Sequence, residues 1–202
     1  KNKPMEFTYE DLMNIELKVV DASDTYKYNS KYDIYEDMSE DEFRNKCVDA
    51  FKVLLEKHIR MCKDELLERF AHIASQSAKS ARFMYENHTM AGYHEEDGIR
   101  SALRHGTIVI GQLGLAETLQ ILIGCDHTSE EGMNLAKEIE SLFNTRCKEF
   151  KSNLKLNFGV YYTPAENLCY TAMQKFKEKY GSIQNISDRD YFTNSMHIPV
   201  WE

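Results

Sequence analysis

The amino-acid sequence predicts an α/β fold with mainly parallel strands and flanking helices. Two short apolar runs, residues 107–113 and 156–162, are rich in β-branched and aromatic side chains, which is typical of buried strands. A helical pattern follows each run, and another helical pattern separates them. Because parallel strands need a long crossover, buried strands that alternate with helices favour parallel pairing.

A long helix is predicted to start directly after Ser39. Ser39 and Glu42 have the spacing of a capping box, in which each side chain hydrogen-bonds the backbone of the other residue. Apolar residues then recur at three- and four-residue steps over residues 43–66, so that one face can be buried. We interpret His58, on that face, as a core or boundary histidine rather than a ligand. The pattern weakens over residues 71–80, where Ala and Ser are frequent.

Two further helices are expected between the two strands. Residues 115–123 are largely apolar and are followed by Gly124, which suits a helix C-terminus. Thr128 and Glu131 form another capping-box pattern, which predicts a helix that runs to about Ser152. The last strand-like stretch of the chain lies near residues 194–199.

The second strand leads into a helix through Thr163-Pro164-Ala165-Glu166-Asn167. Thr163 suits the N-cap, Pro164 suits the first helical position, and Glu166 completes a capping box. The free N–H groups and the positive end of the helix dipole at such a start form an anion site, most often for phosphate. An ordinary strand-to-helix connection has the same pattern, so spacing alone leaves both interpretations open.

Composition and charge exclude several classes of function. The net charge is −8 and the isoelectric point about 5.4, whereas a general nucleic-acid surface would be basic. The apolar runs are far too short to span a membrane, and no signal peptide begins the chain. The five cysteines include no closely spaced pair, which predicts reduced thiols in the cytoplasm and no metal site.

The 202 residues predict one domain or a piece of a larger one. Residues 1–38 are polar and are interpreted as an N-terminal connection without an assigned role, whereas residues 39–202 carry the α/β pattern. Because neither end of the chain resembles a natural terminus, we expect a segment of a longer polypeptide.

Three blocks of sequence resemble the anaerobic (class III) ribonucleoside-triphosphate reductases. They are a Thr-Pro-Ala-Glu loop after an apolar strand, His105-Gly-Thr-Ile-Val-Ile-Gly-Gln-Leu-Gly-Leu-Ala-Glu-Thr-Leu119, and Ser187-Asp-Arg-Asp-Tyr-Phe-Thr-Asn-Ser-Met-His-Ile-Pro-Val200. They occur in the same order as in that family and with similar separations, and they cover about residues 100–202.

The resemblance implies that the chain is part of the ten-stranded α/β barrel of the glycyl radical enzymes. It also implies conversion of ribonucleoside triphosphates to deoxyribonucleoside triphosphates by glycyl and thiyl radical chemistry, with formate or a thiol as reductant. An S-adenosylmethionine-dependent activating enzyme would install the glycyl radical, and the full-length protein would be a homodimer. Zinc would bind in the C-terminal part, outside this chain.

The family's radical residues have no counterpart here. No Arg-Val-Xaa-Gly-Tyr stretch surrounds any of the nine glycines, and neither the finger-loop cysteine nor the zinc cysteine pairs can be found. We therefore expect no catalytic residue in this segment, and no turnover by the segment alone.

The resemblance assigns a substrate-phosphate role to Thr163, Pro164, Ala165, Glu166 and Asn167. The N–H groups of the last three would face the phosphates, with a possible contribution from the Thr163 hydroxyl. Asn167-Leu168-Cys169 departs from the small residues of the family at this point, which leaves the Asn167 side chain without a clear contact. A possible second pocket group consists of Asn194, Ser195 and His197; strand-end hydrogen bonding is the alternative role for these three.

Two other interpretations stay open at this stage. The chain could be a non-catalytic interaction module that docks through its long helix at 39–70, or a segment of another glycyl radical enzyme, such as a relative of pyruvate formate-lyase. A glycyl radical loop with zinc cysteines, about 150 residues downstream, would favour the reductase.

Overall fold

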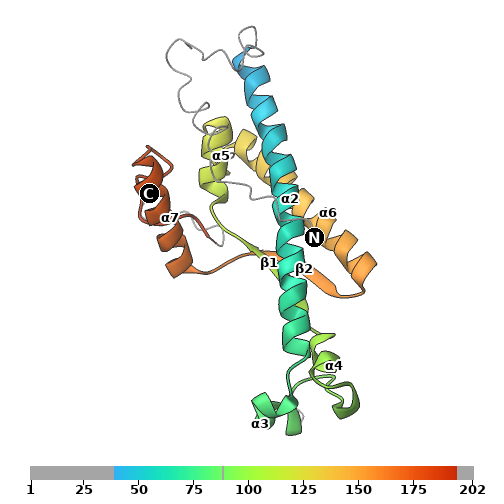
Figure 1. Ribbon diagram of the computed structural model, residues 1–202. Helices are drawn as coiled ribbons and strands as arrows, with labels where there is room; N and C mark the ends of the chain where they lie inside the picture. The colour runs from blue at the N-terminus through green and yellow to red at the C-terminus, as the bar shows by residue number, and fades with distance from the viewer. Residues whose placement is uncertain (1–38, 88, 195–202) are drawn as a thin grey trace, which may run out of the picture. The chain divides into compact units, whose positions relative to one another are not determined.

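The computed structural model describes residues 39–87 and 89–194 (Figure 1). The chain divides into two compact units, and the described part of the first consists of residues 39–53, 114–137 and 165–194. The second unit consists of residues 54–113 and 138–164. The N-terminal connection, residues 1–38, and most of the strand-like stretch near 194–199 lie outside the described residues.

The predicted long helix is α2, Glu40–Ala74. Its capping box is confirmed: the Ser39 backbone N–H donates to Glu42 at 3.0 Å, and the Glu42 N–H donates to the Ser39 hydroxyl at 3.3 Å. His58 is half-buried and hydrogen-bonds the Leu54 carbonyl through Nδ1 at 2.8 Å, as expected of a boundary histidine. The helix ends within the predicted Ala- and Ser-rich stretch.

A small helical lobe follows α2 in the second unit. It consists of α3 (Arg82–Glu86), α4 (Ile99–Leu103) and two 3₁₀ turns, η2 (Ala78–Ala81) and η3 (Glu95–Asp97). Tyr85, Ile99 and Ala102 form its buried cluster, and the ring of Tyr93 lies 4.9 Å from that of Tyr85. This lobe connects the end of α2 to the first strand.

The two predicted strands form a parallel pair, as expected. β1 (Thr107–Gln112) pairs in register with β2 (Asn157–Tyr162), and the two appear as adjacent arrows in Figure 1. Ile110 of β1 is 3% exposed, and the Phe158 ring of β2 packs edge-on against Phe150 at 5.5 Å. Within the described residues this pair is the whole sheet, so the ten-stranded barrel stays a prediction.

The crossover between the strands consists of α5 (Leu115–Ile123) and α6 (Glu130–Leu154). Gly124 ends α5 at φ 75°, a left-handed conformation that glycine adopts without strain. The cap of α6 differs from the prediction by one residue: the Ser129 hydroxyl, not that of Thr128, accepts the Gly132 N–H at 3.0 Å. The Thr128 side chain instead donates to Asp126 at 2.6 Å, which closes the turn before the helix.

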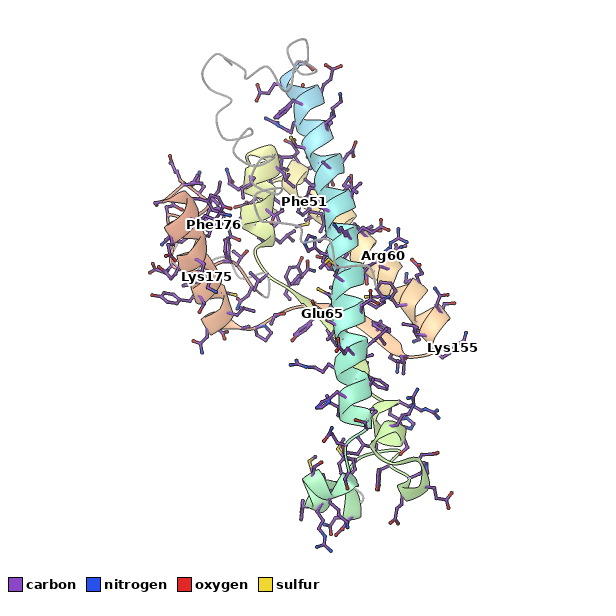
Figure 2. The ribbon with its side chains drawn as sticks, in the orientation of Figure 1. Phe51, Arg60, Glu65, Lys155, Lys175 and Phe176 are labelled. Atoms are coloured by element: carbon purple, nitrogen blue, oxygen red, sulfur yellow. The ribbon has the colours of Figure 1, made fainter. Side chains whose placement is uncertain are left out.

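Within the second unit, α2 and α6 are joined by a cluster of four charged residues. Arg146 contacts Glu56 and Glu149, each at 2.7 Å, and Arg60 contacts the same two carboxylates at 3.1 and 3.6 Å. Figure 2 shows Arg60 projecting from α2 toward α6. Arg146 lowers the pKa of both carboxyl groups. Because these side chains are partly solvated, the cluster adds little stability.

The core of the first unit lies between α5, α7 (Glu166–Tyr180) and the segment that follows α7. Leu119 and Met173 are fully buried, and Phe176 packs edge-on against Phe192 at 5.8 Å. Each described helix is either too short or insufficiently apolar to cross a membrane.

Candidate functional site

The loop between β2 and α7 contains the predicted phosphate residues. β2 ends at Tyr162 and α7 begins at Glu166, so that Thr163, Pro164 and Ala165 belong to neither element. Pro164 is the last residue of the second unit and Ala165 begins a stretch of the first.

The predicted capping of α7 is wrong. The N-cap is Ala165, at φ −121° and ψ 70°, and no side chain makes a capping hydrogen bond there. Pro164 therefore precedes the helix rather than occupying its first position. The reason is that Thr163 continues the strand pairing: its backbone N–H donates to the Gln112 carbonyl at 3.0 Å, which delays the start of the helix.

The start of α7 nevertheless presents backbone donors. The first intrahelical hydrogen bond runs from the Cys169 N–H to the Ala165 carbonyl at 2.9 Å. Among the described residues, the N–H groups of Ala165, Glu166 and Asn167 have no acceptor. The Glu166 and Asn167 side chains are exposed. This is the chemistry of an anion-binding helix start, and it does not depend on the missing cap.

The Thr163 side chain lies over the adjacent strand. A Cβ atom added to Gly111 would overlap the Thr163 hydroxyl oxygen, so β1 has room for that hydroxyl only because residue 111 is glycine. Glycine at this point in a strand thus serves close approach of a neighbouring segment.

One carboxylate holds the carboxyl ends of both strands. Gln112 and Tyr162 form the last register pair of the sheet, and both donate to Glu140 Oε1 of α6, at 2.5 and 2.8 Å. Burial, followed by the hydrogen bond to Glu140, raises the pKa of the Tyr162 hydroxyl, which keeps it protonated as a donor. Sequence reasoning missed Glu140, because nothing in a helical repeat indicates which carboxylate faces a strand end.

A second polar group lies in the first unit, where the Phe192–Asn194 segment passes the starts of α5 and α7. Glu117 is 1% exposed; its carboxylate accepts the Thr193 hydroxyl at 2.8 Å and the Thr193 N–H at 3.1 and 3.2 Å. The Thr193 carbonyl accepts the Gly114 N–H at 2.7 Å. The predicted pocket residue Asn194 is half-buried and directly follows Thr193.

Burial raises the pKa of Glu117, and the hydrogen bonds from Thr193 oppose that rise only in part. Sequence reasoning missed this residue as well, although Glu117 is the one charged residue of the nine-residue helix α5. An isolated carboxylate in an apolar helix was an available signal. Ser195 and His197 lie outside the described residues, so their pocket role stays a prediction.

The described residues contain no group of three or more His, Cys, Asp or Glu side chains that could hold a metal ion. All five cysteines are free, and burial is the main cause that raises the pKa of the Cys147 and Cys169 thiols. Thiols with raised pKa values are weak nucleophiles at neutral pH.

The fold and loop define a class: an α/β segment in which a parallel strand leads into a helix whose first N–H groups can bind an anion. The family model of the anaerobic ribonucleoside-triphosphate reductases, NRDD, matches residues 38–202. The chain therefore belongs to the anaerobic ribonucleoside-triphosphate reductase family.

Individual relatives agree with this assignment. The chain is 29% identical over 155 residues to the anaerobic ribonucleoside-triphosphate reductase of Enterobacteria phage T4, and 27% identical over 156 residues to that of Salmonella typhimurium. Each alignment covers 75% of this chain, but only 24% and 22% of the two relatives. The chain thus spans about a quarter of the length of the curated relatives that it matches.

A solved structure supports the fold. The crystal structure of the anaerobic ribonucleotide reductase from Thermotoga maritima, with glycerol in the active site, superposes with a TM-score of 0.55 at 16% identity. The superposition covers 90% of this chain and 24% of that one. At this identity the likeness concerns the fold alone.

Proposed function

We propose that the full-length protein reduces ribonucleoside triphosphates to deoxyribonucleoside triphosphates, and that this chain supplies the loop that binds the substrate phosphates. The observation that carries the loop assignment is the set of three N–H groups without a described acceptor, at Ala165, Glu166 and Asn167. Family membership supports the activity and favours the reductase over an interaction module.

The loop's own chemistry is binding and orientation. Three N–H donors and the positive end of the α7 dipole favour a negatively charged group, each contributing about 1 kcal/mol when partly buried. Pro164 donates no hydrogen bond but restricts the backbone before the donors. Because a carboxylate opposes a triphosphate, we assign Glu166 a role through its backbone N–H rather than its side chain.

In the family, glycyl and thiyl radical chemistry removes the ribose 3′ hydrogen, and formate or a thiol is the reductant. Neither radical residue has a counterpart in this chain, so its contribution is to hold the triphosphate while the ribose reacts elsewhere in the polypeptide. The possible pocket group of Asn194, Ser195 and His197 belongs to the same proposal, with Glu117 fixing the backbone just before it.

Assignment of the chain to the reductase family leads to further proposals about the full-length protein. They are a radical-activating enzyme that uses S-adenosylmethionine, zinc in the C-terminal part, a homodimeric assembly, a ten-stranded barrel and a cytoplasmic location. No role for nucleic acid or membrane is proposed.

The experiment that tests the proposal uses Thr163→Val in the full-length enzyme. This substitution removes the hydroxyl over Gly111 while keeping the size of the side chain and the backbone bond to Gln112. We expect a raised KM for the nucleoside triphosphate with normal glycyl radical content. Since Thr163 is not the helix cap, the loss of about 1 kcal/mol that accompanies loss of a cap should be absent. Unchanged KM with reduced radical content would assign the loop to barrel assembly instead.

A further inference from the structure

Glu140 holds both strands at the point where the loop begins. Its Oε1 atom accepts one hydrogen bond from the last residue of β1 and one from the last residue of β2, Gln112 at 2.5 Å and Tyr162 at 2.8 Å. The two donors are register partners in a parallel pair, so their side chains emerge on the same face of the sheet. One carboxylate oxygen of Glu140 therefore fixes the distance between the two strand ends and their alignment along the strand direction.

These strand ends determine the position of Thr163. It follows Tyr162 directly, and its N–H donates to the carbonyl of Gln112, so both residues held by Glu140 also hold Thr163. Its hydroxyl lies in the space left by the missing side chain of Gly111. A shift of either strand end would move the first residue of the loop.

Tyr162 can sustain this arrangement over a wide pH range. Burial and the contact with Glu140 both raise the pKa of its hydroxyl, so the proton that forms the hydrogen bond is retained at neutral and mildly alkaline pH. All three residues are only partly buried.

We propose that Glu140 is a positioning residue for nucleoside triphosphate binding. Through Gln112 and Tyr162, Glu140 determines the position of Thr163, the first residue of the phosphate loop. Because Gly111 has no side chain, it leaves the space that the Thr163 hydroxyl occupies in this position. The inference rests on the proposed phosphate role of the loop, and it adds Glu140, Gln112, Tyr162 and Gly111 to the residues that determine substrate affinity.

The first test replaces Glu140 in the full-length enzyme with Ala and with Gln, and measures KM and kcat with cytidine triphosphate, together with glycyl radical content. Glu140→Ala removes the acceptor that the two hydrogen bonds share, and should raise KM about tenfold, which corresponds to about 1.4 kcal/mol of binding free energy, while kcat stays near the parent value. Glu140→Gln keeps an acceptor oxygen and should restore most of the affinity. Equal KM values for all three proteins, or a loss of radical content in Glu140→Ala that Gln does not restore, would overturn the proposal.

A matched pair of glycine variants gives an independent test. A Cβ at Gly111 would overlap the Thr163 hydroxyl, whereas a Cβ at Gly159 in the partner strand would meet only the Thr107 methyl group, at 3.4 Å. Gly111→Ala should raise KM for cytidine triphosphate, and Gly159→Ala should not. If Glu140→Ala does not fold, this pair decides the question, because equal KM values for the two variants would overturn the proposal.

The outcomes separate this inference from the function on which it rests. If Thr163→Val raises KM but Glu140→Ala and Gly111→Ala do not, the phosphate loop stands and the positioning role is wrong. If Glu166→Pro, which removes one of the three N–H donors, also leaves KM unchanged, the loop assignment itself has failed.

Discussion

Thr193 donates both its backbone N–H and its hydroxyl to the buried carboxylate of Glu117. The same hydroxyl oxygen accepts the Ala116 N–H at 3.4 Å, so the threonine also satisfies a donor at the start of α5. A segment that follows α7 by more than ten residues is thereby attached to the helix that follows β1. This attachment determines where Asn194, the predicted pocket residue, lies.

Replacing Glu117 with Gln should change how stability depends on pH. Burial raises the pKa of Glu117 above its usual 4.5, so the folded state holds this proton more tightly than the unfolded state. The stability that the protonated Glu117 contributes to the folded state is complete below pH 4.5 and is lost as pH rises through the folded-state pKa. Each pH unit between the two pKa values is worth about 1.4 kcal/mol. Relative to the parent, Glu117→Gln should therefore gain stability between acidic and neutral pH, as measured by urea unfolding.

Thr193→Val is the matched control for this prediction. It removes the hydroxyl but keeps the backbone N–H that Glu117 accepts. Because this hydroxyl opposes the rise in the pKa of Glu117, its loss should extend the loss of stability to higher pH, the opposite direction to Glu117→Gln. If the difference in unfolding free energy between the parent and each variant is independent of pH, Glu117 does not titrate as described.

Gly132→Ala should destabilise the chain, although the same change within a helix usually stabilises by about 0.5–1 kcal/mol. A Cβ at Gly132 would overlap the Asp126 carbonyl, which belongs to the backbone and cannot move without opening the turn before α6. We expect a cost of about 1–3 kcal/mol. Asn134→Ala, at an exposed position of the same helix, should be neutral or slightly stabilising. A rise in the midpoint of thermal unfolding for Gly132→Ala would contradict the packing of this turn.

The 202-residue chain alone should neither reduce ribonucleotides nor acquire a glycyl radical. Its nine glycines lack the radical motif of the family. Incubation with the activating enzyme and S-adenosylmethionine, followed by electron paramagnetic resonance, should give no doublet signal. A doublet from this chain would mean that one of its glycines carries the radical, and the division of roles proposed above would fail.

The strands and helices were predictable because their signals are local. The β-branched run from Thr107 and the capping box at Ser39 are properties of a few adjacent residues, and the structure has both where expected. The start of α7 was misplaced because Thr163 forms a bond to another strand, with Gln112, and no capping pattern contains that information. At this position a tertiary contact overrode the local preference of the sequence for a helix cap.

The candidate site was predictable only in part, for a related reason. The loop residues 163–167 were identified from a contiguous motif and from the family resemblance. Glu140 and Glu117 became visible only through contacts with residues 22 and 76 positions away, at Tyr162 and Thr193. Contacts of this range depend on packing between elements, which periodicity in one sequence does not determine.

The most direct test of the phosphate loop compares Glu166→Pro with Glu166→Ala in the full-length enzyme. Proline is compatible with the first position of a helix but removes the N–H donor, whereas alanine keeps that donor and removes the carboxylate. If the backbone binds the phosphates, Glu166→Pro raises KM for the nucleoside triphosphate about tenfold, and Glu166→Ala leaves KM unchanged or lowers it. Equal KM values for the two variants, or a higher value for alanine than for proline, would contradict the account.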